Sequence, residues 1–141
     1  MEPIIKEVII NAPVSIVWDA ITDKEQIKHW SFDIPDFKAE VGHEFTFWGG
    51  DESRQFLHIC KVLAVIPEQK LSYTWRYENS KGDSVVTYEL FKEDDATTRV
   101  KLTHEGLEVF ANDGPDFARS NFVAGWEDII GNLLKNYIEK K

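Results

Sequence analysis

The sequence predicts an α+β fold in which a curved antiparallel sheet wraps around a long C-terminal helix, with two short helices after the first strand. Two patterns indicate this arrangement. Apolar and polar residues alternate through several short segments between residues 44 and 104, as in strands with one buried face. From residue 122 to 137 the apolar residues instead recur every three or four positions, as on one face of a helix. The length of 141 residues predicts one domain, spanning residues 1–141.

The N-terminal part begins with a strand and continues with two helices. Residues 4–10 are mostly β-branched, which favours a strand. Pro13 cannot donate a hydrogen bond to a sheet but fits the first turn of a helix, and apolar residues follow at helical spacing as far as Ile21. Asp23 is typical of a helix N-cap, so we expect a second short helix that carries Trp30.

The central part is typical of an antiparallel meander, with short strands joined by polar turns. We expect a bulge or bend at residues 55–66, because apolar side chains there fall on both faces. Gly49 and Gly50, followed by Asp51, are typical of a turn. The expected strands cover residues 44–48, 55–66, 71–76, 86–90 and 99–104.

The C-terminal segment carries the helix that covers one face of this sheet. A helix from about Pro115 to Glu139 would be ~35 Å long, enough to cross the sheet. Trp126 lies in the middle of its apolar face, beside Gly125. Because glycine lowers helix stability by about 1 kcal/mol relative to alanine, we expect Gly125 to permit a close approach of helix and sheet. The apolar face comprises Phe122, Trp126, Ile129, Ile130, Leu133, Leu134 and Tyr137.

Composition and charge argue against several classes of partner. The formal net charge is -9 and the basic residues are scattered, so no basic cluster is available for nucleic acid or an anionic membrane. The single cysteine, Cys60, leaves no intrachain disulfide and suits a reducing compartment. We find no secretory signal and no apolar run near the length of a membrane span. We therefore expect a cytoplasmic protein that binds neither nucleic acid nor membranes.

Short strings along nearly the whole chain resemble one family in their order and spacing. The strings are Ala12–Val14, Val17–Asp23, Ile27–Trp30, Leu71–Trp75, Thr87–Leu90, Leu102–Leu107, Gly125–Trp126 and Leu133–Glu139. They resemble the domain homologous to the activator of the 90-kDa heat-shock chaperone ATPase. That family lies in the START-like, helix-grip superfamily of birch-pollen-allergen-like proteins and polyketide cyclases. The resemblance implies a helix-grip fold with a deep, often apolar cavity between sheet and long helix, no invariant catalytic set, and a chaperone as a candidate partner.

Large side chains on the two facing surfaces are the candidates for lining such a cavity. Rings would supply apolar contact area, while Tyr73, Tyr88, His58 and His104 would supply polar contacts that orient a ligand. A packed aromatic core is the alternative, and a lone histidine such as His104 is more often a satisfied core residue. The candidate ligand-binding residues are Phe45, Phe47, Phe56, His58, Tyr73, Trp75, Val86, Tyr88, His104, Phe122, Trp126, Ile129 and Ile130.

No catalytic motif, metal-ligand spacing or cofactor-binding loop is recognisable, so we predict no catalytic residue, no metal and no cofactor. His58 and Cys60 lie two apart and share a strand face, but we interpret Cys60 as buried and inert. The leading hypothesis is a binding protein for an apolar or aromatic small molecule that is lipid-, polyketide- or flavonoid-like. A chaperone-associated interaction domain is the second hypothesis. A cyclase- or hydrolase-like enzyme that uses His58 or His104 is the third, so we favour a binding protein over an enzyme.

Overall fold

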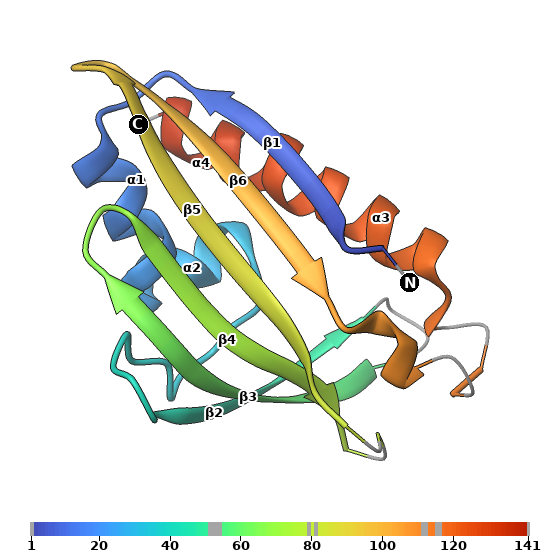
Figure 1. The fold of residues 1–141 in the computed structure, drawn as a ribbon. Helices are drawn as coiled ribbons and strands as arrows, with labels where there is room; N and C mark the ends of the chain where they lie inside the picture. The colour runs from blue at the N-terminus through green and yellow to red at the C-terminus, as the bar shows by residue number, and fades with distance from the viewer. Residues whose placement is uncertain are drawn as a thin grey trace.

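The computed structural model describes residues 2–50, 55–78, 80, 82–110, 113–114 and 117–140. Within them, the elements follow the expected order of one strand, two helices, five strands and a C-terminal helix (Figure 1). The strands are β1 (Ile4–Ile10), β2 (Glu44–Gly50), β3 (Gln55–Ile66), β4 (Lys70–Tyr77), β5 (Ser84–Asp94) and β6 (Thr97–Glu105). The helical elements are α1 (Val14–Thr22), α2 (Lys24–Trp30), η1 (Leu107–Phe110), α3 (Arg119–Asp128), η3 (Ile129–Leu134) and α4 (Lys135–Glu139).

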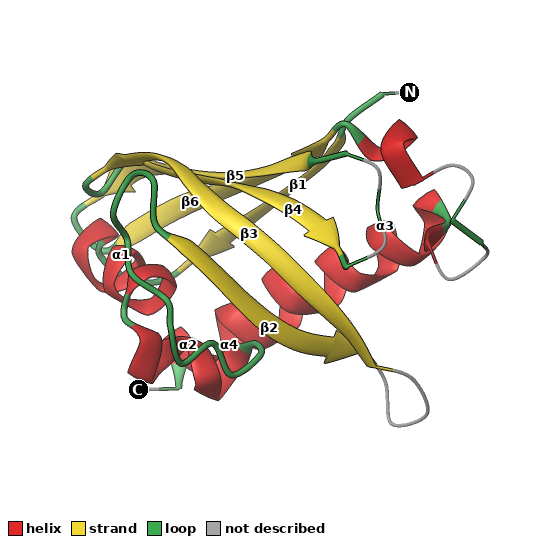
Figure 2. Ribbon diagram, turned by 90° about the horizontal axis from the view of Figure 1, so that it is seen from below, coloured by secondary structure: helices red, strands yellow, loops and turns green. Residues whose placement is uncertain are grey.

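The strands form one six-stranded sheet in the order β1-β6-β5-β4-β3-β2, with every neighbouring pair antiparallel. The sheet is curved, and the C-terminal helix lies along its concave side, while α1 and α2 cover one end (Figure 2). This arrangement confirms the predicted α+β, helix-grip fold. Strands β1 and β2 are the two edges, so the curved sheet remains open between them.

Alternation places the apolar residues of the strands on the concave side. In β5, for example, Val86, Tyr88 and Leu90 are buried while the residues between them are partly exposed. The expected irregularity in β3 is a shift of register between Val62 and Ala64. Before the shift His58, Cys60 and Val62 are buried; after it Val65 rather than Ala64 packs against the core, because the extra residue changes the alternation.

The structure corrects two boundaries. Gly49 and Gly50 do not form a turn but continue β2, where they pair with the first residues of β3; Asp51 lies outside the described residues. The C-terminal helix begins at Arg119, and Pro115 lies outside the described residues. Residues Ile129–Leu134 form a π-helical segment, which the periodicity of the sequence did not predict.

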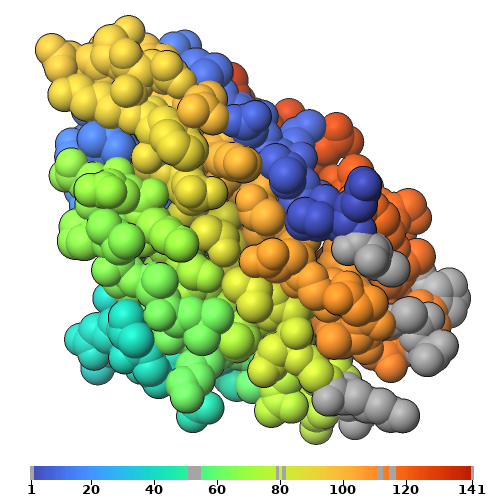
Figure 3. All heavy atoms as spheres, in the orientation of Figure 1, coloured from blue at the N-terminus to red at the C-terminus, as the bar shows by residue number. Residues whose placement is uncertain are grey.

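Polar contacts attach the C-terminal helix to edge strand β1, which separates the helix from β6 in the space-filling view (Figure 3). Lys6 and Glu127 form an ion pair with 2.9 Å between Nζ and Oε1. Lys135 Nζ donates to the carbonyl oxygen of Ile9 at 2.5 Å, and the carboxylate of Glu139 accepts from the backbone N–H that follows the strand at 2.8 Å. These contacts satisfy part of the backbone of β1 that no further strand covers.

Two neighbouring leucines of the helix provide a test of this packing. Leu134 is 0 % exposed, whereas Leu133 is 42 % exposed. We expect Leu134→Ala to lower the free energy of unfolding by about 2–5 kcal/mol, because it leaves a cavity between helix and sheet. Leu133→Ala should change it by less than ~1 kcal/mol. Urea unfolding of both variants measures the difference, and equal losses would contradict the described orientation of the helix.

Candidate functional site

The concave side of the sheet is filled at the end next to α1 and α2. Trp30 from α2 and Phe37 from the loop after it lie against the inner face. The Phe37 ring meets Phe45 edge-on with 5.1 Å between centroids, and Phe45 meets Tyr73 in the same way at 5.3 Å. The space that remains here, beside Tyr73 and Tyr88, is about 20 Å³. It has room for about one water molecule and none for a ligand.

Away from this packed end, a cavity of about 200 Å³ lies between the adjoining ends of β2, β3 and β4 and the first half of the C-terminal helix. We call it the inner cavity. Rings from the sheet and from the helix face one another across it, and no charged side chain is among its described lining residues. The lining consists of Phe32, Gly49, Gly50, Phe56, His58, Trp75, Tyr77, Phe117, Asn121, Phe122, Gly125, Trp126 and Ile129.

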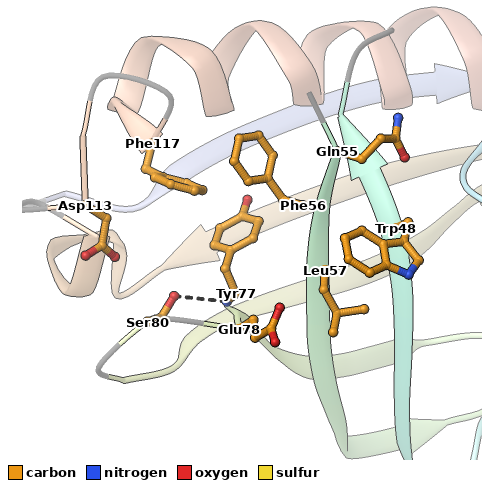
Figure 4. Close-up of a pocket in the computed structure, with 9 residues that line it drawn as sticks. All are labelled: Trp48, Gln55, Phe56, Leu57, Tyr77, Glu78, Ser80, Asp113 and Phe117. Carbon is orange, nitrogen blue, oxygen red and sulfur yellow. Dashed lines mark hydrogen bonds between the residues drawn. The ribbon is translucent and has the colours of Figure 1, made fainter. Parts of the chain in front are cut away.

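A second pocket of about 310 Å³, the outer pocket, shares three aromatic residues with the inner cavity. Phe56, Tyr77 and Phe117 stand side by side and line both spaces (Figure 4). The ring of Phe117 lies 5.0 Å from that of Phe56 and 4.6 Å from that of Tyr77. The outer pocket also carries the carboxylates of Glu78 and Asp113. The three rings therefore separate a space whose described lining carries no charged side chain from a space that carries two carboxylates.

His104 links the C-terminal helix to the sheet through a chain of hydrogen bonds. The Trp126 indole N–H donates to Nδ1 of His104 at 3.0 Å, so the imidazole proton is on Nε2, which donates to Ser84 Oγ at 2.8 Å. The Ser84 hydroxyl donates to the carbonyl oxygen of Trp75 at 2.6 Å. Burial lowers the pKa of His104 to about 3, so the ring is neutral at physiological pH. His104 is thus a satisfied core residue that lies outside the cavity lining.

His58 lies on the inner face of β3 and borders the inner cavity. Its Nδ1–H donates to the carbonyl oxygen of Phe56 at 2.9 Å, which leaves Nε2 as an acceptor. Its ring stacks on Phe47 with 4.3 Å between centroids and meets Trp75 edge-on at 4.8 Å. Burial lowers the pKa of His58 to about 4, against a smaller opposing effect of the Phe56 and Phe47 carbonyls. The ring is therefore held rigidly in its neutral form.

Other buried titratable groups are also kept neutral. The Tyr77 hydroxyl accepts a hydrogen bond from the Trp75 indole at 3.1 Å, and burial raises the pKa of Tyr77 to about 12. Burial likewise raises the pKa of the Tyr73 and Tyr88 hydroxyls and of the Cys60 thiol. Because the thiolate is the reactive form of cysteine, Cys60 is unreactive at neutral pH.

Across the residues that the structure describes, no group of three or more His, Cys, Asp or Glu side chains could hold a metal ion. Of the helices described, none is both long enough and apolar enough to cross a membrane.

The sequence matches the family model described as Activator of Hsp90 ATPase homolog 1-like protein over residues 11–139. This range contains every described residue that lines the inner cavity. The chain belongs to this family. A search of curated proteins found no match.

Solved structures of similar size share the fold of this family member. The protein MLL2253 from Mesorhizobium loti is 27% identical, with a TM-score of 0.81 over 99% of this chain and 98% of that chain. The protein BH1534 from Bacillus halodurans is 28% identical, with a TM-score of 0.73 over 99% and 98%. The Aha1 dimer from Colwellia psychrerythraea is 21% identical, with a TM-score of 0.72 over 99% and 97%, a likeness that shows the fold alone.

The structure separates the predicted site residues of this family member into two groups. Those that line the inner cavity are Phe56, His58, Trp75, Phe122, Trp126 and Ile129. Those that lie outside its lining are Phe45, Phe47, Tyr73, Val86, Tyr88, His104 and Ile130. Phe45, Tyr73 and Tyr88 belong to the packed end, whereas Val86 and Ile130 are fully buried in the core. Ligand contact stays a prediction, and the geometry favours the first group for it.

Several lining residues were not predicted, although some left a signal in the sequence. Tyr77 continues the alternation of Tyr73 and Trp75, so its inward direction could have been read from spacing. Asn121 and Gly125 lie eight and four residues before Ile129, on one side of the helix. The other additions, Phe32, Gly49, Gly50 and Phe117, lie in a loop, at a strand end or in a short 3-10 turn, where periodicity gives no signal.

Gly125 has a different role from the expected one. A Cβ atom at this position would meet no atom within 4 Å, so the helix does not approach the sheet closely there. The glycine instead borders the inner cavity. Gly49 is the opposite case, because a Cβ there would lie 2.9 Å from the Phe32 ring and 3.0 Å from the ring of His58. Gly49 therefore permits the close packing that we had expected at Gly125.

The lowered pKa values of His58 and His104 predict the pH dependence of stability. Between these values, about 4 and about 3, and the ordinary pKa of 6.5, the unfolded chain binds protons that the folded chain excludes. Stability is thus full above about pH 6.5 and is lost as the pH falls. Each histidine should remove ~2 kcal/mol between about pH 7.5 and about pH 5. Urea unfolding at both pH values measures the loss.

Two variants isolate this effect. We expect the free energy of unfolding of His104→Gln to fall by ~2 kcal/mol less than that of the unaltered protein between the two pH values. The variant should be less stable than the unaltered protein at both pH values, because it loses the hydrogen bonds of His104. The matched control is His29→Gln, since His29 is exposed on α2. A His104→Gln protein with the same pH dependence as the unaltered chain would contradict a neutral, buried His104.

Proposed function

We propose that this protein binds a small apolar or aromatic molecule in the inner cavity between the sheet and the C-terminal helix. The main support is the aromatic lining on two facing surfaces around a space of about 200 Å³. Ligand sites in proteins are typically concave and mostly apolar, with a few placed polar groups. Here the rings would provide contact area, and His58, Tyr77 and Asn121 the polar groups.

The volume narrows the class of ligand. An engineered apolar cavity of ~150 Å³ accepts benzene, whereas drug-sized ligands occupy about 300–1,000 Å³. A cavity of about 200 Å³ therefore suits a molecule with one or two fused rings. A longer lipid-, polyketide- or flavonoid-like ligand would also need the outer pocket, and the rings of Phe56 and Phe117 would have to separate to connect the two spaces.

A protein-interaction role, with a chaperone as the candidate partner, is the second proposal. One observation favours it: the Trp48 side chain on edge strand β2 is 59 % exposed, and tryptophan is frequent among the residues that dominate protein interfaces. An enzymatic role is the third. It has less support, because no carboxylate accompanies His58 among the described residues that line the inner cavity.

Filling the inner cavity from Gly125 tests the leading proposal. A Cβ atom at this position would meet no atom within 4 Å and the residue borders the cavity, so we expect the side chain of Gly125→Leu to occupy part of the cavity. We expect affinity for a panel of naphthalene derivatives to fall at least ~10-fold. The free energy of unfolding should stay equal or rise by up to ~1 kcal/mol, because leucine favours helix more than glycine does. Quenching of tryptophan fluorescence and urea unfolding provide the two measurements.

The matched control is Gly131→Leu. This residue lies on the same helix, a Cβ atom added to it would also meet no atom within 4 Å, and it is not part of the cavity lining. It should gain stability in the same way and bind the panel like the unaltered protein. If Gly125→Leu bound as well as Gly131→Leu, the inner cavity would not be the binding site.

A further inference from the structure

We propose that the inner cavity selects a neutral hydroxylated aromatic ligand, a phenol or naphthol, whose hydroxyl group sits between Nε2 of His58 and the hydroxyl of Tyr77. This inference rests on the proposed function and adds the chemical class of the ligand. It follows from two polar atoms that meet at one place in an otherwise largely apolar lining.

The first atom is an acceptor. Since Nδ1 of His58 donates to the Phe56 carbonyl oxygen, Nε2 carries a lone pair. Every fully buried side-chain nitrogen and oxygen of the described residues has a hydrogen-bond partner. The described residues provide no such partner for Nε2, so this atom reaches the accessible space of the inner cavity. Stacking on Phe47 and the contact with Trp75 fix its direction.

The second atom is a donor. The Tyr77 hydroxyl accepts from the Trp75 indole, so one lone pair is used while its own proton has no acceptor among the described residues. The ring of Tyr77 stands between Phe56 and Phe117 with the hydroxyl directed toward the helix (Figure 4). The rings of His58 and Tyr77 are 4.7 Å apart between centroids, and both residues line the inner cavity. Acceptor and donor therefore border the same small volume.

A hydroxyl group complements both atoms at once. It donates its proton to His58 Nε2 and accepts the proton of Tyr77, while the attached ring lies among Trp75, Phe122 and Trp126. A methyl ether can only accept, and an unsubstituted ring does neither. The ether would therefore leave Nε2 of His58 without a hydrogen bond, and the unsubstituted ring would leave both polar atoms without one, which is the usual source of strong discrimination for a hydroxyl.

Charge favours the neutral form of the ligand. No Lys or Arg is among the described residues that line either space. The outer pocket carries the carboxylates of Glu78 and Asp113, and the whole chain has a formal net charge of -9. An aromatic carboxylate would therefore lie near like charge and meet no cation among the described lining residues, where an unpaired charge is costly.

The first test uses four ligands of nearly equal shape on the unaltered protein: 2-naphthol, 2-methoxynaphthalene, naphthalene and 2-naphthoate. Titration followed by tryptophan fluorescence gives the four dissociation constants near pH 7. We expect 2-naphthol to bind at least ~10-fold more tightly than the ether and naphthalene, and 2-naphthoate to bind most weakly. Each tenfold ratio corresponds to ~1.4 kcal/mol.

The second test removes each polar atom separately. Tyr77→Phe deletes the donor, and His58→Phe deletes the acceptor while keeping a ring to stack on Phe47. His58→Phe should reduce the preference for 2-naphthol over its ether to less than ~3-fold, because only the bond to Nε2 distinguishes these two ligands. Tyr77→Phe should keep that preference but weaken the binding of both 2-naphthol and the ether relative to naphthalene. Both variants should leave affinity for naphthalene nearly unchanged. The control Tyr137→Phe removes a hydroxyl that donates to Gln26 at 3.2 Å, outside the cavity lining, and should keep the full preference.

The outcomes separate this inference from the proposed function. Equal affinities for 2-naphthol, the ether and naphthalene in the unaltered protein would overturn the hydroxyl selectivity and leave an apolar binding cavity. Absence of binding by all four ligands would overturn the proposed function itself. Tight binding of 2-naphthoate would contradict the argument from charge. If one variant failed to fold, the ligand series on the unaltered protein would still decide.

Discussion

The hydrogen bond from the Trp126 indole to His104 determines how the C-terminal helix sits on the sheet. Both partners are buried, so breaking the bond would leave two polar groups unpaired, at about 1–3 kcal/mol each. The series of hydrogen bonds continues from His104 through Ser84 to the carbonyl oxygen of Trp75. It thereby connects the helix with the neighbouring strands β6, β5 and β4. Trp126 borders the inner cavity and holds its ring 5.5 Å from that of Trp75. The helix cannot rotate or move closer to the sheet without losing this bond.

The position of the cavity follows from what faces the sheet at each end. At the packed end, α2 and the loop after it supply rings such as Trp30 and Phe37, which interdigitate with the rings of the strands. At the other end the helix supplies Gly125, which has no side chain to place against β3 and β4. The same inward-facing aromatic pattern therefore forms a packed core at one end and a cavity at the other.

Periodicity explains both the success and the limits of the sequence predictions. The bounds of β1 and β3 follow from residue pattern alone, because each is an unbroken run rich in β-branched and other apolar residues that ends at a turn or proline. The division of the inner face into a packed end and a cavity cannot be predicted from residue pattern. It depends on the loop after α2, where Phe32 and Phe37 follow no regular spacing. Gly125 was misread because a sequence reveals a missing side chain but not what lies opposite it.

The inner cavity weakens the domain in two ways. Gly125 lowers helix stability by about 1 kcal/mol relative to alanine, although no neighbouring atom requires a glycine there. The rings around the cavity also lack atoms on one side and so forgo dispersion contacts. A Cβ atom at position 125 would meet no atom within 4 Å, so alanine there would remedy the first weakness, and a larger apolar side chain would fill part of the space. An aromatic ligand would restore the contacts while leaving position 125 open, and a hydroxyl on it would engage His58 and Tyr77 as well. A domain selected for stability alone would fill this space, so the open space itself argues for an occupant.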